Sequence, residues 1–327
     1  MIEDTGLGMA LIGLSLLSAA VMGLAIQRGA TCMVAAVDEA YSTGQLTRAR
    51  ALAEASLWVA GPLAIASLLG IQLTPAGSYP AGAMAIGGGL LLGLGAFVNS
   101  ACVFGSIARI GSGNWHFLLT PPGFFIGSWL HGFLAIDRTP ITTATEHSPT
   151  MWLIAVLFLL SVVLRLFEIL GASRRGTLLE RVNQPSFATI AIGATFVVLL
   201  LTAGPWAYTQ VLDRLAHGGM GFNLFQLLLL GALFAGAIAG GWRTRTTFAF
   251  NARTALKCIL GGALMGFGSA LIPGGNDNLI LNGLPAFHAY AWLAITSMVI
   301  AIWIGLIVSK NWSKLRRLPR SESRTLG

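Results

Sequence analysis

The chain has 327 residues, of which 55% are hydrophobic and 10% are charged, and its formal net charge is +8. Together with a mean hydropathy of +0.76, this composition lies far outside the range of soluble globular proteins and indicates an integral membrane protein embedded in a lipid bilayer. We expect no nucleic-acid partner, because the basic residues are spread over short segments between apolar runs.

Apolar stretches follow one another along the chain, and a helix of about 20 such residues crosses a ~30 Å hydrocarbon core. We therefore predict an all-α membrane protein with about nine transmembrane helices plus short re-entrant helices. The expected spans are 7–26, 51–71, 82–98, 117–136, 151–171, 187–208, 222–241, 258–272 and 286–309. The acidic N-terminus has no basic region or cleavage site, so we interpret it as the first span rather than a signal peptide.

Three segments do not fit a plain span. The runs 82–98 and 258–272 are short, so a half-crossing or re-entrant geometry is expected there. The segment 27–47 is too polar to span and too apolar for a loop, so a short interfacial or re-entrant helix is predicted. The run 240–253 is a weaker echo of it in the second half.

A glycine-rich pattern occurs twice, at 88–111 and at 261–283. Alignment of the two copies places Gly88, Gly89, Leu91, Gly93 and Gly95 on Gly261, Gly262, Leu264, Gly266 and Gly268. Glycines at four-residue spacing also favour close helix packing, but packing does not explain the polar residues that follow each copy. Interrupted apolar segments, one in each half of a membrane protein, are typical of a transport site.

The repeat predicts one polytopic domain over 1–327 with two pseudo-symmetric, inverted halves. The first half covers 1–172 and the second covers 187–309; a basic linker lies between them and a basic tail, 310–327, follows. An odd number of spans puts the termini on opposite faces. The face expected to be inside carries Arg28, Arg48, Arg50, Arg109, Arg174, Arg175, Arg181, Arg243, Arg245, Arg253, Lys257 and the tail, whereas the other face keeps little more than Arg138 and Arg214. The asymmetry predicts a periplasmic N-terminus and a cytoplasmic C-terminus.

The chain has three cysteines, of which Cys258 lies in an apolar run and fits a small buried hydrophobic residue. Cys32 follows Arg28, and Cys102 lies near Gly105 and Arg109. Both cysteines therefore have polar and basic neighbours, which favour the thiolate form or the binding of an anion. A purely structural role in packing would also explain Cys32 and Cys102. No cysteine or histidine spacing indicates a metal site, and the sequence predicts no cofactor.

The second glycine-rich copy ends in Gly274, Gly275, Asn276, Asp277 and Asn278. A carboxylate beside a loop at membrane depth indicates function, although Asp277 could instead lie in an outer loop and cap the following turn. Glycine-rich loops leave backbone N–H groups free to bind an anion, and the N-termini of half-helices add positive potential.

The runs QRGATCMVAA, GLGAFVNSACVFGSIARIGSGN and GALMGFGSALIPGGNDNLI resemble the YeeE/YedE family of sulfur-compound membrane transporters over roughly residues 10–305. In this resemblance Cys32 matches the first family cysteine, and Cys102, Gly105, Arg109 and Gly111 match the second loop. The resemblance implies uptake of thiosulfate or a related sulfur anion, passed along thiols by transient S–H···S hydrogen bonds. It also implies two facing loops that meet in mid-membrane. The repeat itself, with an odd number of crossings between its two copies, predicts that loops 99–106 and 273–278 approach each other near mid-membrane from opposite faces.

This chain departs from the family pattern at Gly275, where the family has a cysteine, so a three-cysteine relay is not intact. Transport of a selenium compound is one alternative. Another is a membrane acceptor of sulfane sulfur, with Cys32 or Cys102 receiving it from a soluble sulfurtransferase of the TusA or rhodanese type. A structural subunit without a pathway is a third. No ATP-binding motif is present and no enzymatic activity is expected, while the energy coupling stays open.

Overall fold

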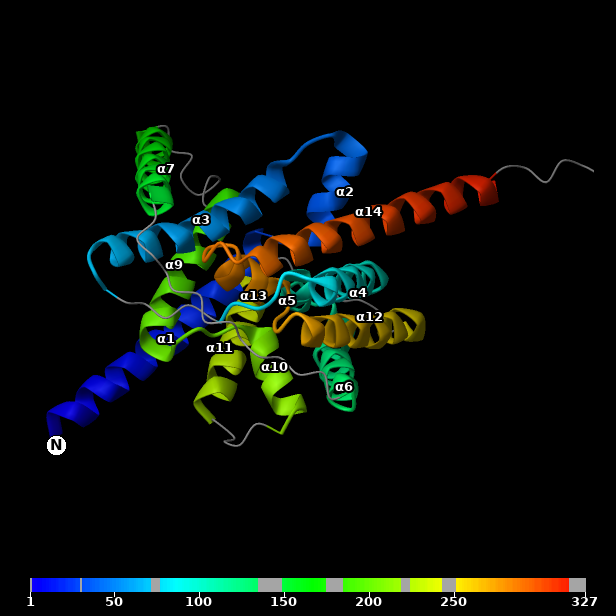
Figure 1. Ribbon diagram of the computed structural model, residues 1–327, viewed down its shortest axis with the longest axis horizontal. Coiled ribbons are helices and arrows are strands. Elements are labelled where there is room, and N and C mark those ends of the chain that lie inside the picture. The colour runs from blue at the N-terminus through cyan, green and yellow to red at the C-terminus, as the bar shows by residue number, and fades with distance from the viewer. Residues whose placement is uncertain are drawn as a thin grey trace, which may run out of the picture.

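Figure 1 shows the computed structural model, which describes residues 2–29, 31–71, 77–134, 149–174, 185–218, 224–242 and 251–317. All the elements of these residues are helical, as predicted. The basic positions Arg138, Arg175, Arg181, Arg243 and Arg245, the core of the linker, most of the run 240–253 and the residues 318–327 of the tail lie outside the described residues. Their part in the predicted orientation is therefore not tested by the structure.

The helices follow the chain in the expected order. They are α1 (Ile2–Gly29), α2 (Met33–Thr43), α3 (Thr47–Leu68), α4 (Ala83–Asn99), α5 (Val103–Gly111), η1 (Trp115–Leu119), α6 (Thr120–Gly132), α7 (Pro149–Arg174), α9 (Pro185–Ala203), α10 (Tyr208–Ala216), α11 (Leu224–Gly240), α12 (Ala252–Leu271), α13 (Asn276–Asn278), η2 (Leu279–Gly283) and α14 (Ala289–Arg317). A helix occupies each place where a span was expected.

Seven stretches among the described residues are helical, long and apolar enough to cross a membrane, so the chain is a multi-pass membrane protein. They involve α1, α3, α4, α7, α9, α12 and α14. The helix α11 is a shorter apolar helix of 17 residues, and α6 has 13 residues. The N-terminal end of α1 and the C-terminal end of α14 point to opposite ends of the long axis (Figure 1).

The helix α12 corrects one expectation. It was expected as a short segment at 258–272 but has 20 residues and begins at Ala252. The reason is local, because Asn251 caps the helix by accepting a hydrogen bond from the N–H of Arg253, at 3.0 Å. The first two turns of the helix contain the charged residues Arg253 and Lys257, so the hydropathy pattern did not include them in the expected span.

Short helices interrupt the bundle in four places. The helix α2 has 11 residues, which confirms the short helix expected within 27–47. The helix α5 has nine residues, and α13 with the following η2 turn forms the second short segment after a glycine-rich helix. The helix α10, also of nine residues, was not expected from the sequence. In Figure 1 the short helices α5 and α13 lie near the centre of the molecule.

The two glycine-rich helices, α4 and α12, pack directly against each other through their repeated glycines. A Cβ added at Gly95 would lie 2.7 Å from the carbonyl oxygen of Gly261, and one added at Gly261 would lie 2.7 Å from that of Gly95. Gly88 and Gly268 show the same reciprocal relation, again at 2.7 Å. Both pairs leave room for hydrogen only, so the backbones touch and the ends of the two helices are fixed relative to each other.

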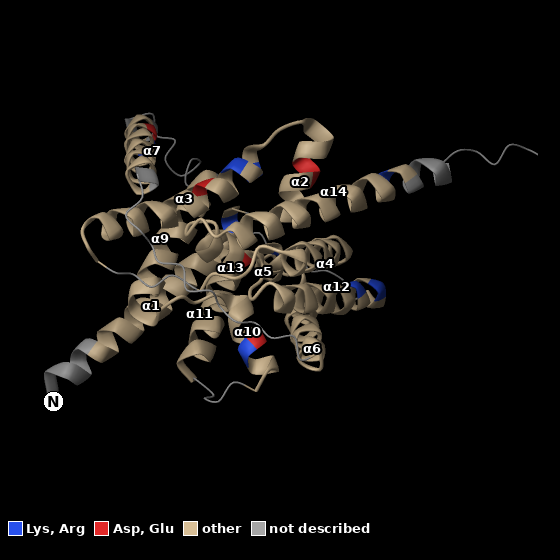
Figure 2. Ribbon diagram, in the orientation of Figure 1, with Lys and Arg blue, Asp and Glu red and all other residues tan. Residues whose placement is uncertain are grey.

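The remaining helices form matching contacts around this crossing. The helix α4 packs on α14 and α12 packs on α6, while α1 packs on α11 and α3 packs on α9. The helix α7 lies at the edge against α3, where Arg165 forms an ion pair of 2.6 Å with Glu54. Figure 2 shows charged positions mainly toward helix ends, with most of the ribbon uncharged.

We predict that Gly95→Ala lowers the free energy of unfolding by about 1–3 kcal/mol, because the added methyl group forces apart two backbones. Gly87→Ala, on the same helix, is the matched control, since no heavy atom lies within 4 Å of its added Cβ. Thermal unfolding of the purified proteins in detergent measures both. Equal stability of the two variants would show that the α4–α12 crossing is loose.

Candidate functional site

Four helices begin near the centre of the bundle, and their capping residues fall into two pairs with similar backbone geometry. Cys32 caps α2 with φ −153° and ψ 127°, and Ala207 caps α10 with φ −137° and ψ 144°. Cys102 caps α5 with φ −75° and ψ −176°, and Gly275 caps α13 with φ −72° and ψ −178°. Helix N-termini expose backbone N–H groups and carry a partial positive charge, which favours anions.

The loops after the two glycine-rich helices meet directly. The backbone N–H of Val103, at the start of α5, donates to Oδ1 of Asn276 at 3.2 Å. This hydrogen bond confirms that loops 99–106 and 273–278 approach each other, whereas their depth in the membrane and the faces from which they come stay predictions. The amide Nδ2 of Asn276 is completely buried and has no hydrogen-bond partner in the described residues. A buried donor without an acceptor is costly, so it marks a place where a ligand acceptor would fit.

Cys32 and Cys102 lie together on one side of this junction. The backbone N–H of Met33 donates to Sγ of Cys102 at 3.2 Å, and the two thiols are within hydrogen-bonding reach of each other. Gly105 makes this possible, because a Cβ added there would lie 2.5 Å from Sγ of Cys32. In the sequence Cys32 lies on one segment and Cys102 and Gly105 lie on another, and the fold brings the two segments into contact.

A hydrogen-bonded network holds the first loop in shape. Ser100 adopts a left-handed conformation with φ 59°, which ends α4 sharply. The amide of Asn99 donates to the carbonyl of Ala101 at 2.8 Å and to the hydroxyl of Ser106 at 2.9 Å. The guanidinium of Arg109 donates to the carbonyl of Ser100 at 3.1 Å. The loop is thus a rigid support for Cys102 rather than a mobile connection.

The second loop is held by α10, through Thr209. The N–H of Gly275 donates to the Thr209 hydroxyl oxygen at 3.1 Å, and the N–H of Thr209 donates to Oδ2 of Asp277 at 3.0 Å. The Thr209 hydroxyl also hydrogen-bonds Asp277 Oδ1. The side chain of Gln210 donates to Asn278 at 2.9 Å. Asp277 is only 3% exposed, so the alternative of a capping residue in an outer loop is wrong.

Gly274 and Gly275 shape the second loop in different ways. Its φ of +137° is a backbone conformation that favours glycine, and it lets the chain turn from α12 into the loop. A Cβ at Gly275 would meet Cγ2 of Thr209 at 2.5 Å and Oδ1 of Asp277 at 2.9 Å. The place of the family cysteine is therefore filled by the Thr209 side chain.

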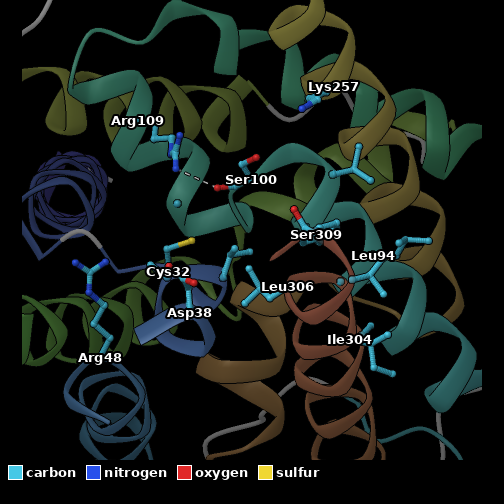
Figure 3. Close-up of a pocket in the computed structure, with 18 of the residues that line it drawn as sticks. Cys32, Asp38, Arg48, Leu94, Ser100, Arg109, Lys257, Ile304, Leu306 and Ser309 are labelled. Atoms are coloured by element: carbon cyan, nitrogen blue, oxygen red, sulfur yellow. Dashed lines mark hydrogen bonds between the residues drawn. The ribbon is translucent and has the colours of Figure 1, made fainter. Parts of the chain in front are cut away.

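A cavity of about 1180 Å³ lies beside Cys32 (Figure 3). Arg48, Arg109 and Lys257 line it, together with the single acidic residue Asp38. The ammonium of Lys310 lies 2.8 Å from that carboxylate. In the view of Figure 3, Cys32 lies between Arg109 and Asp38. The cavity is thus a positively charged chamber with a thiol in its wall, suited to an anion.

The structure distributes the expected site residues over three places. Cys32, Gly105 and Arg109 line the cavity. Cys102 and Asn276 meet at the junction, with Gly274, Gly275, Asp277 and Asn278 in the loop behind Asn276. Arg28 is exposed in the last turn of α1 and is not among the cavity residues. Cys258 is fully buried on α12, which fits its interpretation as a packing residue.

Sequence reasoning missed Thr209 and assigned Arg48 and Lys257 to topology alone. A signal for Thr209 existed in Gly204 and Pro205, which end the preceding span, followed by Trp206 to Gln210. In the first half α1 likewise ends at a small residue, Gly29, and a short helix begins directly after Cys32.

We predict that Cys32 reacts with a methanethiosulfonate reagent at least about tenfold faster than Cys258, since reactivity requires access. The cavity reaches Cys32, whereas Cys258 is 0% exposed. Single-cysteine variants, labelled in detergent and read by mass spectrometry, give the two rates. A Cys258 that is labelled as fast as Cys32 would contradict the cavity described here.

Two comparisons with known proteins agree with this geometry. The model of the family described as Sulphur transport matches residues 28–304, which is most of the chain. The thiosulfate transporter TsuA of Escherichia coli (strain K12) is 24% identical over 341 residues, covering 88% of this chain and 92% of that protein. The stretch from Arg28 to Ile304 includes both loops, Cys32, Cys102 and most of the residues that line the cavity. On this match the chain belongs to the Sulphur transport family.

Proposed function

We propose that the chain imports thiosulfate or a related sulfur-containing anion along a path that passes the junction of Cys102 and Asn276. One observation carries the proposal most directly. A thiol, a buried amide donor without an acceptor and the starts of two short helices meet next to a positively charged cavity. The family and the relative named above support a sulfur anion as the substrate.

The proposed path uses weak contacts in series. From the outer face the anion would pass Gly275 and Asn276, reach Cys102, move on to Cys32 and leave through the cavity. Backbone N–H groups at helix N-termini favour its charge, and thiols are soft, weak donors that suit a terminal sulfur atom. Weak binding at several sites lets a substrate leave as well as enter. The S–H···S contact of the two cysteines would be the thiol part of the route.

We further propose that the chain has two inverted halves of about nine crossings, with α1, α3, α4, α6, α7, α9, α11, α12 and α14 as the crossings. The reciprocal glycine contacts of α4 and α12 support a local two-fold axis between them. The matched caps of α2 with α10 and of α5 with α13 support the same relation.

The proposed location is the bacterial inner membrane, with the cavity toward the cytoplasm and the N-terminus toward the periplasm. The positive-inside rule supports it, because Arg48, Arg109 and Lys257 gather on the cavity. A soluble sulfurtransferase partner is part of this proposal, with Cys32 as the thiol it would approach. The volume of the cavity, about 1180 Å³, leaves room for more than a small anion.

Counterflow of radiolabelled thiosulfate into liposomes that contain the purified chain tests the function. We expect Cys102→Ala to reduce the initial rate by at least about tenfold, which corresponds to a barrier that is ~1.4 kcal/mol higher. Cys32→Ala should reduce it partly, since that residue lies at the wider exit, and Cys258→Ser should leave it unchanged.

Unlabelled sulfur and selenium oxyanions as competitors identify the substrate among the related species. Wild-type counterflow without any added protein excludes an obligatory sulfur donor, as a pure persulfide acceptor would require. Full activity of Cys102→Ala at equal protein level would eliminate the thiol route. No counterflow by the wild type would contradict transport itself.

Restoration of the family cysteine gives a separate prediction. Gly275→Cys alone should fail to transport, because its Cβ would lie 2.5 Å from the Cγ2 methyl of Thr209. Adding Thr209→Ser removes that methyl and keeps the hydroxyl for Asp277. The two remaining close contacts, with the hydroxyl oxygen at 2.8 Å and with Oδ1 of Asp277 at 2.9 Å, are to side-chain atoms that can shift, so the double variant should recover part of the transport. Thr209→Ser by itself is the control. Equal rates for the single and double cysteine variants would show that the space around Gly275 does not limit passage.

A further inference from the structure

Asp277 is a buried carboxylate for which the transport path gives no role. Its two oxygens accept hydrogen bonds from the N–H and the hydroxyl of Thr209. An asparagine could accept the same N–H bond without the cost of burying a charge at membrane depth. The presence of an ionisable group at this place therefore calls for a reason other than support of the loop.

The surroundings of Asp277 are apolar apart from these donors. It lines a second cavity of about 10 Å³, close to the volume that one water molecule needs. The residues that line this cavity with Asp277 are Met22 and Ile26 of α1, Phe104 and Ile107 of α5, Trp206, Ala207 and Tyr208 at the start of α10, Leu233 of α11 and Leu281 of η2. Tyr208 is the titratable group among them, and none is a cation.

The neighbouring elements bring few other ionisable groups to this carboxylate. Cys102, a titratable thiol, caps α5 at the junction. Gln210 and Asn278, which hydrogen-bond each other beside the loop, are neutral. Arg48, Arg109 and Lys257 line the basic cavity, whose lining does not include Asp277. The negative charge of Asp277 is thus not balanced by a cation among the residues lining its cavity.

The position of this charge matters because of its distance from the path. An added Cβ at Gly275 would lie 2.9 Å from Oδ1 of Asp277 and 2.5 Å from Cγ2 of Thr209. An anion can therefore pass Gly275 on this side only when the Thr209 side chain moves, and it then comes close to the carboxylate. Two negative charges at such a distance repel strongly at low dielectric, and protonation of one of them removes the repulsion. Anion binding and proton binding are then linked, each favouring the other.

We propose that Asp277 is a proton-binding site that couples anion passage to proton movement in the same direction. The inference rests on the proposed transport function. The carboxylate takes up one proton from the outer face, the anion passes Gly275 beside the neutral acid, and the proton is released on the cavity side. No bond to sulfur forms and nothing is oxidised or reduced. One proton with a thiosulfate dianion moves one net negative charge instead of two, which lowers the electrical work against an inside-negative potential.

The test is thiosulfate accumulation in liposomes with the membrane potential held at zero by potassium and valinomycin. For one proton per anion, a pH gradient of one unit, acid on the outer face, should give an inside-to-outside concentration ratio of about ten. Asp277→Asn should exchange labelled for unlabelled thiosulfate yet keep a ratio near one. Asp213→Asn, a carboxylate on α10 that contacts Ser128, is the matched control and should accumulate as the wild type does.

Each result decides between separate claims. Wild type that exchanges thiosulfate but never accumulates it under the pH gradient overturns the coupling and leaves transport intact. Accumulation that persists in Asp277→Asn overturns the assignment to this carboxylate. If that variant is not recovered in folded form, the smaller neutral Asp277→Ser takes its place, and alkalinisation outside wild-type liposomes during thiosulfate entry reads the proton directly. Wild type without any exchange overturns the transport function, not this inference alone.

Discussion

The backbone contact between α4 and α12 is the constraint on which the site depends. Gly88, Gly95, Gly261 and Gly268 let the two helices touch without side chains between them. Each helix then ends in its own loop, and the two loops meet in the hydrogen bond from Val103 to Asn276. Any larger residue at the crossing would separate the helices and with them the two halves of the junction. The repeated glycines thus position the two loops as well as packing the two helices.

The second constraint is the cost of irregular backbone inside a membrane, where unpaired N–H and C=O groups lack water. The fold meets it with side chains around the loops, such as Asn99 behind Cys102 and Thr209 behind Gly275. At the junction itself, the side-chain donor Nδ2 of Asn276 stays buried without an acceptor among the described residues. A site that binds an anion only briefly benefits from one unsatisfied donor, because a fully satisfied loop would offer the substrate nothing.

Much of this architecture follows from the sequence because its signals are local or repeated. Hydropathy placed the helices, and the duplicated glycines indicated the meeting loops around Cys102 and Asn276. Other features required the fold. The Gly204-Pro205 break marks the segment of Thr209, but the role of this residue arises from contact with Asp277, 68 positions away. Arg48 and Lys257 belong to different segments that only packing brings to one cavity. Contacts between distant residues depend on helix packing, which no single segment encodes.

The position of the bound anion tests the central claim most directly. Crystals grown with selenosulfate, the selenium analogue of thiosulfate, allow the anion to be located by anomalous diffraction at the selenium edge. The account predicts a peak in contact with Asn276 and the thiol of Cys102, or with Cys32 at the wall of the basic cavity. An ordered selenium atom elsewhere, such as between α3 and α7, with none along this route, would contradict it.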